Sequence, residues 1–334
     1  MKKEIISAIE HKQTDQVPYN IELTSSFAQK LMKEMNCTDV DKFLGNQMLR
    51  VKYKLNRPAD HEYEYDIYGV KWQRSKDGGD VGNIVGYPMS LDSFDGYTFP
   101  SVCTEAIEKG LAALAEDTRD RFRMFGVTMS FFERSWSLRS MENILVDMCI
   151  NPEFTFELYD KIEQHIYGVL DLILDKDFEA LYIGDDYGQQ RGLIMGPPLW
   201  RKFIKPGMSR IIARAKSAGK YVVLHSCGDC REILPDFIEM GVDVYNTVQP
   251  EIYDLQWLKR EYGADLTFYG GISTQQFLPF ASKEETAKET DRVLSIMASG
   301  GGYILSPTHA VTDDIPVANV LELISRADRR GERR

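Results

Sequence analysis

The chain has 334 residues, enough for one large domain or two smaller ones, and 43% of them are hydrophobic, so a sizeable core can form. Its 40 Lys and Arg residues against 51 Asp and Glu residues give a formal net charge of −11, which argues against nucleic acid as the main partner. No stretch reaches the roughly 20 apolar residues of a membrane span, and residues 1–18 form a charged amphipathic segment rather than a signal peptide. These features predict a cytoplasmic protein that does not contact a membrane.

Short runs of β-branched and apolar residues alternate with longer amphipathic segments, and no repeat or low-complexity linker divides them. The predicted strands are 17–23, 47–53, 121–130, 179–186, 221–226, 243–248, 266–271 and 302–307, and the helical segments include 141–174, 197–219 and 283–300. This alternation predicts a single-domain α/β protein, an eight-stranded parallel (β/α)8 TIM barrel spanning residues 1–334. A doubly wound open sheet is the alternative.

Residues 63–89 interrupt the alternation. Tyr65, Ile67 and Val70 are followed by KDGGDVGN (76–83), which has the Gly and Asp residues that a tight turn requires. We therefore expect a β-hairpin insertion near residues 63–90.

The chain has five cysteines, an odd number spread over a long sequence. This low and odd count predicts reduced thiols rather than a disulfide framework. Cys37, Cys103 and Cys149 are isolated and are predicted to be bystanders. Cys227 and Cys230, by contrast, lie beside a histidine in a chain that has only 5 histidines.

Polar residues gather where the predicted strands end, and the carboxyl ends of the strands are where barrel enzymes carry their chemistry. They are Glu22, Thr24, Asp185, Asp186, His225, Cys227, Cys230, Gln249, Ser273, Gln275 and His309. A barrel with a purely structural role does not need so many polar groups at this end.

The segment LHSCGDC (224–230) carries the sharpest pattern. Alternate residues of a strand point to the same side, so His225 and Cys227 are expected to face one site. A thiolate and an imidazole suit Zn²⁺, whose catalytic sites take three protein ligands and leave one position open. The third ligand would be His309 or Cys230, although Cys230 is expected to begin the next helix. A redox pair and two small buried residues are the alternative interpretations of the two cysteines.

Asp185 and Asp186 close one predicted strand, so one carboxylate should face the site while the other caps a helix or meets solvent. The inward carboxylate could orient a cationic substrate, take up a proton or support a metal-bound histidine. A capping role alone is the alternative.

Taken in order, five segments resemble the uroporphyrinogen decarboxylase superfamily. They are IGDDYGQQRGLIMGPPLWRKFIKP (183–206), LHSCGD (224–229), GVDVYNTVQP (241–250), FYGGISTQQFLP (268–279) and GGGYILSPTHAVTDDIPVANV (300–320). The resemblance covers essentially the whole chain. It implies a single (β/α)8 barrel and one of two activities, cofactor-independent porphyrinogen decarboxylation or cobalamin-linked methyl transfer.

Two local features favour the methyltransferase branch. The decarboxylases carry an arginine-rich segment after the first strand, whereas residues 17–31 contain no arginine, and a polyanionic substrate would meet an acidic protein. His225 and Cys227 match the zinc ligands of the coenzyme M methyltransferases. Those enzymes take a third ligand, a cysteine, from the loop after the last strand, where this chain has His309; this match supports zinc and argues against coenzyme M itself as the acceptor.

The resemblance therefore implies a zinc-dependent methyltransferase that exchanges a methyl group between a small methylated or thiol substrate and a corrinoid, as in methylcobalamin. The chain has no D-x-H-x-x-G pattern, so the corrinoid would come on a partner protein or free in solution. His225, Cys227 and His309 would hold zinc, while Asp186 and Gln249 orient the substrate and Glu22 is a further candidate. A uroporphyrinogen decarboxylase-type enzyme is one alternative, and a non-catalytic subunit that binds a ligand or a corrinoid protein is the other.

Overall fold

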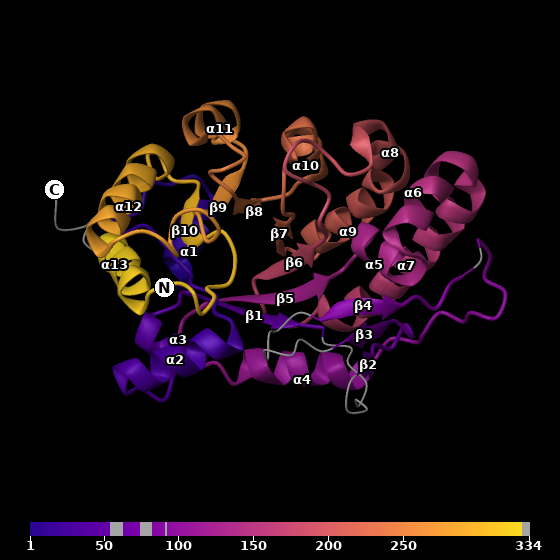
Figure 1. Cartoon of the computed structure of the whole chain (residues 1–334), viewed down its shortest axis with the longest axis horizontal. Helices are drawn as coiled ribbons and strands as arrows, with labels where there is room; N and C mark the ends of the chain where they lie inside the picture. The colour runs from indigo at the N-terminus through magenta and orange to yellow at the C-terminus, as the bar shows by residue number, and fades with distance from the viewer. Residues whose placement is uncertain (54–62, 74–81, 91, 329–334) are drawn as a thin grey trace. The chain divides into compact units, whose positions relative to one another are not determined.

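A computed structural model describes residues 1–53, 63–73, 82–90 and 92–328. The helices, labelled in Figure 1, are α1 (Lys2–Ile9), α2 (Ser25–Met35), α3 (Val40–Leu44), α4 (Thr104–Ala115), α5 (Phe132–Arg139), α6 (Met141–Ile150), α7 (Pro152–Ile173), α8 (Gly196–Phe203), α9 (Lys205–Ser217), α10 (Leu234–Met240), α11 (Leu255–Tyr262), α12 (Lys283–Met297) and α13 (Val317–Asp328), with a 3-10 helix at Arg231–Ile233. Among these helices none is both long and apolar enough to cross a membrane.

The main sheet contains, within the described residues, seven strands in the hydrogen-bonded order β1, β5, β6, β7, β8, β9, β10. Their bounds are β1 (Met48–Lys52), β5 (Phe122–Thr128), β6 (Ala180–Gly184), β7 (Tyr221–His225), β8 (Val244–Val248), β9 (Thr267–Ile272) and β10 (Tyr303–Pro307). The pairs β5–β6, β6–β7, β8–β9 and β9–β10 are parallel. All seven strands fall where the sequence predicted them.

The first predicted strand, 17–23, forms no ladder but two isolated parallel bridges, Tyr19 to Leu305 and Leu23 to Val311. On its other side, side chains replace the ladder bonds. The backbone N–H of Ile21 donates to the side-chain oxygen of Asn46 at 2.8 Å, and the Asn46 amide donates back to the carbonyl oxygen of Ile21 at 2.9 Å. The segment thus pairs with β10 and bonds to the residues just before β1. The parallel strand order, completed by this segment, is that of a (β/α)8 barrel, and the predicted α/β fold class is confirmed.

Contacts divide the chain into two compact units. The first unit consists of Met1–Leu49, Asp117–Arg123 and Asp243–Arg334, and the second of Arg50–Glu116 and Met124–Val242. Two of the four boundaries fall inside β1 and β5, and the other two fall between α4 and β5 and between α10 and β8, so the units are interleaved along the sequence.

In the first unit, α12 packs against α11, α13 and β9, and α1 packs against β10 (Figure 1). A capping box begins α12: Ser282 accepts the backbone N–H of Glu285, and the Glu285 carboxylate accepts the backbone N–H of Ser282. Both contacts satisfy N–H groups that a helix start leaves without intrahelical partners.

In the second unit, two predicted helical segments are each broken into two helices. The segment 141–174 divides at Asn151, whose side chain accepts the backbone N–H of Phe154 and caps α7, and Pro152 takes the first position of α7. The segment 197–219 divides at Ile204, two residues before Pro206 in the first turn of α9. Proline lacks the N–H that would continue the preceding helix, which explains both breaks.

The predicted insertion is confirmed as a small antiparallel sheet of β2 (Tyr63–Tyr65), β3 (Lys71–Gln73) and β4 (Asn83–Gly86) in the second unit. Most of its predicted turn, residues 76–81, lies outside the described residues. Asp66 attaches the insertion to α5, because its carboxylate accepts a hydrogen bond from buried Arg134 at 2.8 Å. The Arg134 guanidinium also stacks on the Tyr68 ring, 3.8 Å from its centroid.

Candidate metal centre

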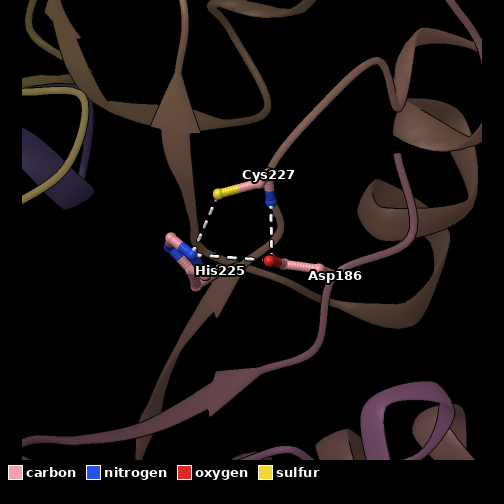
Figure 2. Close-up of side chains that lie close together, drawn as sticks. All are labelled: Asp186, His225 and Cys227. Carbon is pink, nitrogen blue, oxygen red and sulfur yellow. Dashed lines mark hydrogen bonds and ion pairs between the residues drawn. The ribbon is translucent and has the colours of Figure 1, made fainter. Parts of the chain in front are cut away.

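Asp186, His225 and Cys227 lie together in the second unit, where β6 and β7 end (Figure 2). Nε2 of His225 is 3.5 Å from Sγ of Cys227 and 3.6 Å from Oδ1 of Asp186. The backbone N–H of Cys227 donates to the same Asp186 oxygen at 2.8 Å. Within the described part of the chain these residues form a group whose candidate ligand atoms all lie within 4.8 Å of one another.

Strand alternation explains how the sequence builds this group. His225 ends β7 in register with Gly184 of β6, and Asp186 and Cys227 each follow two residues later. Residues two apart share a face, so the three side chains emerge on one side. The predicted proximity of His225 and Cys227 is therefore present in the structure.

Asp185 points the other way and is fully buried. Its carboxylate accepts the backbone N–H groups of Phe131, Phe132 and Glu133 at 3.1, 2.8 and 2.8 Å, and so caps the start of α5. Burial raises the pKa of Asp185 to about 6, against the lowering effect of these hydrogen bonds. The acidic pair thus divides as expected, with one carboxylate in the site and the other capping a helix.

Two glycines hold the loops after β6 and β7 in backbone contact. A Cβ on Gly188 would lie 2.5 Å from the backbone N of Asp229, and a Cβ on Gly228, at φ +81°, would lie 2.2 Å from the carbonyl carbon of Gly188. The N–H of Gly188 donates to the carbonyl oxygen of Cys227 at 3.2 Å. Only glycine permits this approach, which fixes the Cys227 backbone relative to the loop that carries Asp186.

Glu133, in the first turn of α5, brings a further carboxyl group close to this site. Burial first, then the charges of Asp186 and Asp185, raise the pKa of Glu133 well above its usual value. Burial first, then the charges of Asp186 and Glu133, also raise the pKa of the Cys227 thiol. Sequence patterns gave no sign of Glu133, because only the tertiary contact between α5 and the end of β6 brings it here.

The donor set fits a divalent cation. Imidazole nitrogen, thiolate sulfur and carboxylate oxygen are the zinc ligands of proteins. A cation between them would offset the repulsion among the carboxylates and favour the ionised thiol. The same groups without a cation hold the thiol neutral, as the direction of its pKa shows.

The other predicted site residues lie elsewhere in the chain. Cys230 is fully buried before the 3-10 helix, as expected, with Sγ 3.3 Å from Oγ of Ser226. Glu22, buried Gln249 and exposed His309 belong to the first unit, and their roles stay predictions. Within that unit, the carbonyl oxygen of Glu22 accepts the N–H of Val311, so the segment of Glu22 bonds to the loop of His309. All five cysteines are free thiols.

Comparison with known proteins confirms the family. The sequence model described as "Uroporphyrinogen decarboxylase (URO-D)" matches residues 79–330, which is most of the chain. A search of curated proteins finds no match. The match to the family model supports an enzymatic role for the chain.

A solved structure shares the fold of this protein over nearly its whole length. A methyltransferase from Methanosarcina mazei is similar with a TM-score of 0.76 and 16% identity, over 98% of each chain. D-psicose 3-epimerase from Clostridium cellulolyticum H10 has a TM-score of 0.45 and 10% identity, over 93% of this chain and 94% of the epimerase.

Proposed function

Because the chain belongs to the uroporphyrinogen decarboxylase family, with an imidazole, a thiol and a carboxylate gathered in one group, we propose that it is a zinc-dependent methyltransferase. It would exchange a methyl group between a small methylated or thiol substrate and a corrinoid, carried by a partner protein or free in solution. The group of Asp186, His225 and Cys227 carries this proposal, since porphyrinogen decarboxylation uses no cofactor. The fold shared with a methyltransferase is consistent with it.

His225 and Cys227 would hold the metal through Nε2 and Sγ. The third ligand is predicted to be His309, and Asp186 competes for that role because its carboxylate is within reach. Zinc supplies a Lewis acid with an open position, which lowers the pKa of a thiol or activates the leaving group of a methylated substrate.

The protein groups around the metal would set its geometry. Asp186 accepts the N–H of Cys227, and the contact of Gly188 with Gly228 keeps the two loops together, so the thiol and the imidazole are preorganised. Asp186 and Gln249 stay the predicted groups that orient the substrate, and Glu22 stays a further candidate.

Metal analysis tests the ligand set. The protein purified without chelator should contain about one zinc per chain, and His225→Ala and Cys227→Ala should each lose it. Cys149→Ala, which removes an exposed thiol outside the group, is the matched control and should keep the metal. Full zinc occupancy in both His225→Ala and Cys227→Ala contradicts the proposed site.

The third ligand can be assigned in the same way. If Asp186 is a ligand, Asp186→Ala should lose zinc while His309→Ala keeps it, and the reverse result assigns His309. Cys230→Ala should keep zinc in either case, because its sulfur faces Ser226.

Activity is tested with methylcobalamin and a panel of thiols. Methyl transfer to a thiol should release cob(I)alamin, followed by its absorption spectrum, and Cys227→Ala should abolish the reaction. Transfer that continues in Cys227→Ala would contradict the role of the group. If the zinc-loaded protein fails to demethylate methylcobalamin with every thiol of the panel, the result favours the non-catalytic subunit.

The family description favours a decarboxylase as the second candidate. The absence of arginine in residues 17–31 opposes it, because carboxylated porphyrinogens need cationic partners. A spectroscopic titration with coproporphyrin separates the two: tight binding that needs no metal supports the decarboxylase, and no binding supports the methyltransferase.

A further inference from the structure

Arg50, Tyr182 and His225 form a stack inside the second unit. Cζ of Arg50 lies 4.1 Å from the centroid of the Tyr182 ring. The Tyr182 ring in turn stacks on the imidazole of His225, with centroids 6.2 Å apart and planes inclined by 25°. Tyr182 is almost fully buried, so this contact is shielded from water.

Gly126 leaves room for the Arg50 side chain to reach Tyr182. Arg50 is on β1 and Tyr182 on β6, and β5 lies between these strands in the sheet order. Gly126 of β5 is in register with Tyr182. A Cβ on Gly126 would lie 3.7 Å from Cγ and Cδ of Arg50 and 3.0 Å from the carbonyl oxygen of Val51. The aliphatic part of Arg50 therefore uses the space that a longer side chain at position 126 would fill.

We propose that Arg50 and Tyr182 are positioning residues that hold the imidazole of His225 in the orientation that directs Nε2 to Cys227 and Asp186. This inference deepens the proposed function and rests on it for its role in metal binding. A guanidinium over a tyrosine face and an offset pair of rings are both attractive, and both gain strength away from water. A planar guanidinium keeps the tyrosine ring in place, and the tyrosine ring keeps the imidazole from rotating about its Cα–Cβ and Cβ–Cγ bonds.

The first experiment measures the motion of the imidazole in the protein without metal. The Cε1–Hε1 order parameter of His225 is obtained from carbon-13 relaxation, and its signal is assigned by its loss in His225→Asn. On a scale where a rigid backbone group is near about 0.85 and a flexible one is below about 0.6, it should lie near the rigid end in the wild type and near the flexible end in Arg50→Met and Tyr182→Leu. Tyr182→Phe keeps the ring and should behave as the wild type.

The arginine variant makes this experiment decisive. Arg50 contacts the Tyr182 ring, which in turn stacks on the imidazole of His225. The proposal therefore expects Arg50→Met to act on the imidazole through Tyr182. Arg50→Gln is a second replacement in case Arg50→Met folds poorly, which thermal unfolding would show. An unchanged order parameter in the folded arginine variants and in Tyr182→Leu overturns the proposal.

Metal binding separates this inference from the proposed function. Cobalt(II) should bind the wild type and Tyr182→Phe alike, with a thiolate-to-cobalt absorption band, and bind Arg50→Met and Tyr182→Leu about 3- to 10-fold more weakly. If the wild type and all three variants show the thiolate-to-cobalt band and bind cobalt(II) with the same affinity, the positioning role in metal binding is overturned. If the wild type binds no cobalt, the proposed zinc site fails, and the order parameters still decide whether the stack holds the imidazole.

Discussion

Asp185 and Asp186 are neighbours in the sequence with opposite surroundings. Asp185 is fully buried and caps α5, whereas the Asp186 side chain is 38% exposed and meets His225 and Cys227. Sequence alternation predicted that the pair would divide. His225 decides which of the two acids faces the site. Gly184 is in register with His225, and Asp186, two residues after Gly184, lies on the same side as the imidazole.

Replacing these acids separately should therefore separate stability from metal binding. Asp185→Ala leaves three backbone N–H groups, two of them buried, without their acceptor and should lower the free energy of unfolding by about 2–4 kcal/mol. Asp186→Ala should lower it by less than about 1 kcal/mol but weaken zinc binding. Denaturant unfolding and zinc titration of both variants check this, and equal losses of stability would show that the two acids are equivalent.

Two glycines with a positive φ, Gly228 and Gly219, allow a matched pair of substitutions to alanine. Gly228 has φ +81° and its Cβ would meet backbone atoms, whereas Gly219 has φ +73° and nothing within 4 Å of the added Cβ. Gly219→Ala should cost only the strain of the left-handed conformation, about 1–2 kcal/mol, and keep zinc. Gly228→Ala must also separate the two loops and should lose zinc. Bound zinc and unfolding free energy measure both effects, and zinc retained by Gly228→Ala would mean that the loop contact does not support the site.

At the scale of elements, the strands could be predicted closely and the helices less so. Apolar β-branched runs such as YVVLHS (221–226) mark buried strands, and β7 ends one residue before that run does. The segment 141–174 looked like one amphipathic helix, but the local effect of Asn151 and Pro152 divides it. Glu133 could not be predicted, because its place depends on how α5 packs against the end of β6.

Asp236 of α10 ties three helices of the second unit together. It accepts hydrogen bonds from Arg201 of α8 and Lys205 of α9, at distances of 2.8 and 2.7 Å. Burial acts to raise the pKa of Asp236, but these two cations outweigh it and the pKa is lowered. The ionised form is therefore favoured in the folded chain.

The sign of this shift predicts a pH dependence. A carboxyl whose pKa is lower in the folded than in the unfolded chain contributes stability above its unfolded pKa of about 3.9 and loses it as the pH falls through the folded value. Asp236→Asn should lower the free energy of unfolding by about 1–2 kcal/mol at pH 7, a difference that shrinks below pH 4. Urea unfolding between pH 3 and 7 checks this, with exposed Glu108→Gln as a control. A constant difference over this range would contradict it.

At the scale of the whole molecule, the alternation of strands and helices was sufficient to predict the barrel class. The alternation could not show that residues 17–23 pair through side chains of Asn46 and its neighbours instead of a full ladder. Nor could it show the two compact units, between which the chain passes four times, twice within the strands β1 and β5. Such features depend on which side chains meet after folding, and the alternation of apolar and polar residues along the sequence does not determine these contacts.

Zinc should stabilise the whole chain, because a ligand that binds only the folded state raises its stability by mass action. With free zinc at about 100 times its dissociation constant, the gain is about 2.7 kcal/mol. At about 2.1 cal/mol/K of unfolding entropy per residue, this predicts a rise in Tm of roughly 4 °C for a chain of 334 residues. Calorimetry with zinc and with chelator measures it. Cys227→Ala should show no rise and Cys149→Ala the full one, since only Cys227 belongs to the group. The same rise in both variants would place the bound zinc outside it.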